Sequence, residues 1–166
     1  MIILMECAVL CVLFTLAVGT ASLKDPLAGV HNWPPAIQRR AKELGLIQAE
    51  QMAGSKKVYA KKLAAALVIS AVFAAVVYFV NGARSFAAGF GSSYLIWTVV
   101  NWYDAFVIDC LWVCHDRRVR IPGTEDMREY QDYWFHIRGS LKGQVLGLAV
   151  ALLAGGLTAF MAATLR

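Results

Sequence analysis

The sequence predicts an all-α integral membrane protein with four transmembrane helices and two amphipathic interfacial helices on the cytoplasmic side. Hydrophobic residues make up 59% of the 166 residues and charged residues only 16%, whereas soluble domains average roughly 45–50% and about 25%. Four apolar stretches each reach or approach the ~20 residues that a helix needs to cross a bilayer. They do not alternate as the shorter strands of a barrel would. The length predicts one membrane domain, residues 1–166.

The predicted spans cover residues 1–22, 63–80, 94–114 and 143–165. The first stretch has no Lys or Arg before its apolar run, and Glu6 stands where a signal peptide carries positive charge. We therefore expect it to remain as a span.

Basic residues set the predicted orientation. The segment between spans one and two holds eight Lys and Arg, and the segment between spans three and four holds six. The positive-inside bias places the loops 23–62 and 115–142 in the cytoplasm and both termini outside, in a cell (inner) membrane. The net charge of +5 lies beside the spans, where it meets anionic headgroups. No motif indicates nucleic acid as a partner.

Each long loop contains a predicted interfacial helix. In the first loop, Pro35 suits a helix start, and Ile37, Ala41 and Leu44 recur on one face. In the second loop, Thr124 is a candidate N-cap. The apolar face of that second helix would consist of Met127, Tyr130, Trp134, Ile137 and Leu141.

Ionisable residues inside the predicted spans are costly in lipid and therefore indicate a cavity or a partner. Asp104 lies near the middle of span three, and Asp109 lies closer to its cytoplasmic end. On an α-helix Asp109 faces another side, so a carboxylate dyad is not expected. The sequence predicts a polar ligand pocket open to the cytoplasm, formed by Asn101, Asp104, Asp109, His115 and His136. In the alternative, Asp104 and Asp109 accept hydrogen bonds from Trp or Tyr side chains and from the backbone, and these bonds hold the helices of the bundle together.

Two groups of residues have spacings that could bind a metal, and neither is expected to do so. Asp132 and His136 are spaced i, i+4 and could bind metal or act as acid and base, but a stripe with Glu125 and Glu129 is more typical of a solvated face. Cys7 and Cys11 belong to the outer leaflet, and the other two cysteines, Cys110 and Cys114, to the cytoplasmic end. The sequence thus predicts no metal and no cofactor.

Small residues recur every four positions along span four. The stripe consists of Gly143, Gly147, Ala151, Gly155 and Ala159. Such a stripe lets another helix approach closely, either within the molecule, in a homo-oligomer or from a membrane partner protein.

Several local motifs stand out along the chain: Asn101-Trp102-Tyr103-Asp104, Asp109, Ile121-Pro122-Gly123-Thr124-Glu125, Tyr130, Tyr133, His136, Lys142-Gly143 and, in the first loop, Trp33-Pro34-Pro35-Ala36-Ile37-Gln38. Together they resemble a family of small, uncharacterised bacterial multi-pass membrane proteins. The resemblance implies a bacterial multi-pass protein and brings no activity with it.

Three functions follow from these observations. The leading hypothesis is a cytoplasm-facing pocket that binds a small or amphiphilic ligand, with or without processing or transport. The second is an accessory or assembly subunit of a membrane complex that packs through the stripe of span four. The third is a lipid-modifying membrane enzyme that uses His136 and an acid.

Overall fold

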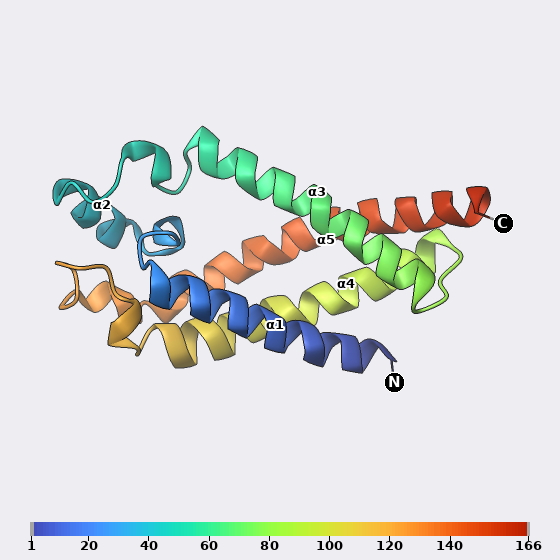
Figure 1. The fold of residues 1–166 in the computed structure, drawn as a ribbon, viewed down its shortest axis with the longest axis horizontal. Coiled ribbons are helices and arrows are strands. Elements are labelled where there is room, and N and C mark those ends of the chain that lie inside the picture. Colours follow the sequence, from blue (N-terminus) through green and yellow to red (C-terminus); the bar gives the residue numbers. More distant parts are fainter. Residues whose placement is uncertain (1, 166) are drawn as a thin grey trace. The chain divides into compact units, whose positions relative to one another are not determined.

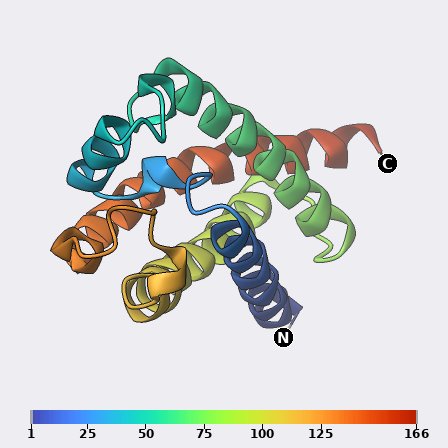
Figure 2. The same cartoon turned by 60° about the vertical axis from the view of Figure 1, so that its left-hand side comes forward.

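A computed structural model describes residues 2–165, which form helices and turns without a strand in that range (Figure 1 and Figure 2). The α-helices are α1 (Ile2–Lys24), α2 (Pro35–Glu43), α3 (Lys56–Phe79), α4 (Phe86–Tyr103) and α5 (Tyr133–Thr164). The short helices are η1 (Val30–Asn32), η2 (Ala49–Gln51), η3 (Asp104–Val113), η4 (Arg117–Val119) and η5 (Arg128–Gln131). The predicted all-α class is confirmed.

Three segments of the described chain are long and apolar enough to cross a membrane: Ile2–Lys24, Ala49–Phe79 and Tyr133–Thr164. Many of their apolar side chains point outward, as Leu4 and Val145 do with 71% of each exposed. Such surfaces suit lipid, because contiguous exposed apolar area is uncommon on soluble monomers. The predicted third span, 94–114, is divided between α4 and η3 and is not one of these segments.

The chain forms two compact units. Unit 1 comprises residues 2–11, 63–103 and 140–165 of the described part, and unit 2 comprises residues 12–62 and 104–139. Both units therefore combine segments that are far apart in the sequence.

In unit 1, glycines allow α4 and α5 to pack closely. A Cβ built on Gly147 would lie 2.1 Å from the Trp97 ring, and one on Gly155 would lie 3.0 Å from the backbone of Phe86. Ala151 is fully buried and Ala159 is half-buried. At these glycines the small stripe is occupied by α4 of the same molecule.

In unit 2, α2 begins at Pro35 as the sequence predicts, and Ile37 and Ala41 are fully buried. The helix packs against η5. Tyr130 of η5 is also fully buried, and burial raises the pKa of its hydroxyl. Its oxygen accepts a hydrogen bond from the Ile121 backbone N–H at 2.9 Å, which fixes the second loop onto the core.

The second predicted interfacial helix does not form as a separate element. Thr124 caps no helix, because its hydroxyl bonds to the Ile121 carbonyl and to the Tyr130 hydroxyl. The chain then passes through η5 to Asp132, whose carboxylate accepts the Phe135 N–H at 2.9 Å and caps α5. Residues from Tyr133 onward belong to α5, so the predicted face and the acidic stripe from Glu125 to His136 are not continuous.

The segment Asp104–Val113 continues α4 as a π-helix. Its hydrogen bonds close between residues five apart, as between the Cys114 N–H and the Asp109 carbonyl at 2.9 Å. Residues five apart then lie nearly on one face. The expectation that Asp104 and Asp109 diverge assumed α-helical spacing, whereas the segment is a π-helix in which the two carboxyls interact electrostatically.

Candidate functional site

A histidine–aspartate pair with a buried imidazole lies in unit 2. The Nδ1 atom of His136 is 3.0 Å from Oδ2 of Asp109, and the His136 side chain is only 5% exposed. His136 stands in the first turn of α5, directly after the Asp132 cap, and Asp109 stands in the middle of η3. Two distant segments of sequence therefore build the pair.

Aromatic rings hold the imidazole in place. Trp33 meets it edge-on with ring centroids 6.2 Å apart, and Phe135 does so at 5.4 Å. Trp33 is itself fixed, because its ring packs edge-on against Tyr130 at 4.6 Å and its carbonyl accepts a hydrogen bond from the Gln38 side chain at 2.6 Å. The histidine thus has a rigid orientation.

Two further groups lie beside the pair. Asp104, one π-helical turn before Asp109, is close enough to interact electrostatically with Asp109 and with His136. The buried thiol of Cys114 also interacts electrostatically with the imidazole. Within residues 2–165, no three His, Cys, Asp or Glu side chains are arranged to hold a metal ion.

The second ring nitrogen of His136 makes no hydrogen bond of ordinary geometry within the described chain, and the Cys114 thiol lies beside the ring. That nitrogen, Nε2, is buried. His136 and Asp109 border a cavity of about 70 Å³, whose wall also includes Val18, Ser22, Asn32 and Trp33. Buried polar atoms without a partner are uncommon in folded proteins, which makes Nε2 a candidate binding atom.

The geometry limits what this cavity can do. Its volume is the share of about two water molecules and far below the roughly 300 Å³ of a typical small-molecule pocket. It therefore holds a small polar group rather than a whole amphiphile. With Nδ1 held by Asp109, Nε2 can accept a hydrogen bond from that group when the ring is neutral and donate one when the ring is protonated.

Two predicted pocket residues lie elsewhere. Asn101 belongs to unit 1, where its amide donates to the Ser140 carbonyl at 3.1 Å and to Gln144 at 3.2 Å. His115 is exposed and shares a hydrogen bond of 2.9 Å with the Tyr133 hydroxyl. Neither borders the cavity, because Asn101 is engaged with α5 and His115 lies beyond the end of η3.

Two titratable groups outside the candidate spans, Asp116 and His31, have lowered pKa values. Asp116 accepts hydrogen bonds from the Arg118 side chain and backbone and from Trp112, which together hold the pKa of this carboxyl well below its usual range. Partial burial, with Lys62 and Lys61 nearby, lowers the pKa of His31.

Sequence reasoning missed Trp33 and Ser22 as parts of the site. Trp33 stood out as part of the Trp33-Pro34-Pro35 motif, and its buried place against His136 depends on where α5 begins. Ser22 gave no signal, because a lone serine near a span end is common. The spacing of Asp104 and Asp109 indicates a shared face only on a π-helix, and nothing in the sequence predicted a π-helix in this segment.

Comparisons of the chain with family models, with curated proteins and with solved structures gave no match. The function is therefore inferred from the site alone.

Proposed function

We propose that the chain is a multi-pass membrane protein whose Asp109–His136 pair binds a hydroxyl-bearing group of a small or amphiphilic ligand. The observation that supports this most is the unpartnered Nε2 of His136 at the cavity. A hydroxyl can donate to that nitrogen or accept from it, according to the protonation of the ring, while Asp109 holds the opposite side. Because two carboxyl groups, those of Asp104 and Asp109, lie beside the ring, a neutral hydroxyl suits the cavity better than an anion.

The size of the cavity supports a ligand that inserts only its polar end. About 70 Å³ admits a hydroxyl and its carbon, whereas an apolar tail must remain outside. Val18 and Ser22 of the apolar helix α1 border the cavity. In this proposal, the tail of an amphiphile lies along apolar surface while its headgroup reaches His136.

We further propose the finer membrane arrangement. Residues 94–114 form a fourth span, both long loops are cytoplasmic, and both termini are outside, in a bacterial cell membrane. Support comes from the fourteen Lys and Arg residues of those loops, eight in the first and six in the second. The resemblance to small bacterial membrane proteins belongs to the same proposal. Basic clusters beside the spans would draw anionic headgroups to the surface.

The test is native mass spectrometry of the full chain released from its own membranes in a mild non-ionic detergent. Wild type is compared with His136→Gln, which removes the free nitrogen, and with His115→Gln as the matched control at an exposed histidine. Wild type and His115→Gln should carry the same additional mass, and His136→Gln should lack it. Fragmentation of the species that carries the additional mass then identifies the ligand.

Two results would overturn the proposal. One is the same bound mass on folded His136→Gln as on wild type, and the other is a bare chain in all three proteins. If His136→Gln does not accumulate, Ser22→Leu fills the cavity while the histidine itself is retained. Retention of the ligand by Ser22→Leu would contradict binding in this cavity.

A second function, a lipid-modifying enzyme, is favoured by the Ser22 hydroxyl at the same cavity. A histidine oriented by a carboxylate can take the proton of a hydroxyl as a general base. Turnover of the identified ligand by wild type, and its loss in folded Ser22→Ala, would support an enzyme. Binding without turnover would leave the binding function alone. The accessory-subunit hypothesis has less support, because Gly147 and Gly155 already face α4.

A further inference from the structure

A second unusual site lies in unit 1, independent of His136. Glu6 is an acidic residue within the otherwise apolar helix α1. Its Oε2 atom accepts a hydrogen bond from the Asn81 amide nitrogen at 3.1 Å. The other carboxylate oxygen, Oε1, and the Asn81 carbonyl oxygen are both buried and have no hydrogen-bond partner among residues 2–165. The pair therefore presents two buried acceptors that lack a donor.

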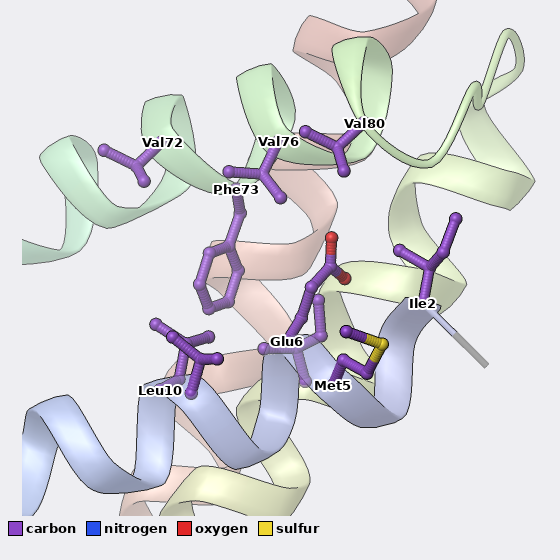
Figure 3. A pocket seen from close by; sticks show the side chains of 10 residues that line it. Ile2, Met5, Glu6, Leu10, Val72, Phe73, Val76 and Val80 are labelled. Atoms are coloured by element: carbon purple, nitrogen blue, oxygen red, sulfur yellow. The ribbon is translucent and has the colours of Figure 1, made fainter.

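Glu6 borders a large apolar cavity. The cavity has a volume of about 390 Å³ and is walled by α1, α3 and α4. Figure 3 shows Glu6 rising from α1 toward α3, among Phe73, Val76 and Val80. Glu6 is the one charged residue in the wall of this cavity within the described chain. The volume lies in the usual range for small-molecule sites, roughly 300–1,000 Å³.

The chemistry of the wall defines the occupant. Two unpartnered acceptors, one of them a carboxylate, call for a group that is positively charged and carries several N–H donors. A primary ammonium has three such donors, whereas a quaternary ammonium has the charge and no donor. The remaining wall is apolar and suits a hydrocarbon chain. A phosphate-bearing lipid fits poorly, since the wall has no Lys or Arg.

Arg84, the basic residue closest to Asn81 in the sequence, already has partners of its own. The Arg84 guanidinium donates to the carbonyls of Tyr78 and Ala83 and lies 3.9 Å above the Tyr78 ring.

We propose that the Glu6 cavity binds a primary alkylammonium compound, with its ammonium on Glu6 and Asn81 and its chain between α1 and α3. This site goes beyond the proposed function and does not depend on it.

The test measures adducts of the full chain by native mass spectrometry in a non-ionic detergent. Three probes share one chain length: octylammonium, octyltrimethylammonium and 1-octanol. Wild type should bind one octylammonium saturably, and the other two probes at least about tenfold more weakly. Glu6→Gln keeps the shape and removes the charge, so octylammonium should lose its advantage.

A matched pair of variants tests the cavity itself. Val76→Phe fills the cavity and should abolish octylammonium binding, whereas Val68→Phe adds the same ring to an exposed face of α3 and should not. Equal binding of the three probes to wild type would overturn the proposal. So would adducts that accumulate without saturation, or an unchanged preference in Glu6→Gln. If Glu6→Gln does not accumulate, equal binding by the two Phe variants decides against the site.

Discussion

Replacement of Gly147 by alanine should destabilise the packing of α4 on α5. A Cβ at this position would lie 2.1 Å from both Cδ1 and Nε1 of Trp97, a distance that no van der Waals contact permits. The indole cannot move away freely, because its Nε1 donates a hydrogen bond to the Gly143 carbonyl at 3.1 Å. The added methyl group therefore either displaces the indole and breaks this bond or separates the two helices.

The expected magnitude combines three terms. Overpacking a close contact costs about 1–3 kcal/mol, and loss of the Trp97 hydrogen bond adds about 1 kcal/mol. The higher helix propensity of alanine than of glycine offsets about 0.5–1 kcal/mol of these two costs. Gly147→Ala should therefore lower the free energy of unfolding by about 2 kcal/mol. Gly156→Ala, with no atom within 4 Å of the new methyl group, should raise it slightly.

The assay is reversible unfolding of the purified chain by SDS titration in mixed micelles, followed by far-UV circular dichroism. Both variants carry the same substitution in α5, so composition and helix propensity cancel in the comparison. The reasoning predicts that Gly147→Ala unfolds well before Gly156→Ala. If the two unfold together, or if Gly147→Ala is the more stable, the α4–α5 contact described here is wrong.

Other substitutions test unit 2 in the same assay. Tyr130→Phe leaves the buried Ile121 N–H without its acceptor and should cost about 1–3 kcal/mol, whereas Tyr133→Phe at an exposed site should change stability by less than about 0.5 kcal/mol. Asp132→Ala removes the cap of α5 and should cost about 1 kcal/mol; an unchanged midpoint would contradict the cap. The lowered pKa of His31 means that the unfolded chain binds more protons, so stability should fall as the pH drops below about 6.5. His31→Gln should remove that part of the pH dependence between pH 7.5 and 5.5, and an identical profile would refute it.

The helical class and much of the local organisation could be predicted from the sequence. Apolar runs of span length identify α1, α3 and α5, because lipid demands long helices whatever their partners. The start of α2 follows from Pro35, whose fixed φ suits a first turn. Such features depend on residues near each other in the chain.

The candidate site was predictable only in part. Asp104, Asp109 and His136 stood out, since ionisable groups near spans are costly, and the structure places these three close together. Their arrangement depends on the π-helical spacing of η3 and on Asp132 starting α5 where it does. Asn101 was assigned to the pocket from α-helical periodicity alone, and its amide instead binds α5.

The central claim is that Asp109 and His136 act as one unit in holding a ligand, and a double-mutant cycle tests it most directly. Ligand retained per chain is measured by native mass spectrometry for wild type, Asp109→Asn, His136→Gln and the double variant. If the carboxylate acts by orienting the imidazole, Asp109→Asn should lose most of the bound mass that His136→Gln loses, and the double variant should carry no more than either. Full retention of the ligand in folded Asp109→Asn would contradict the account.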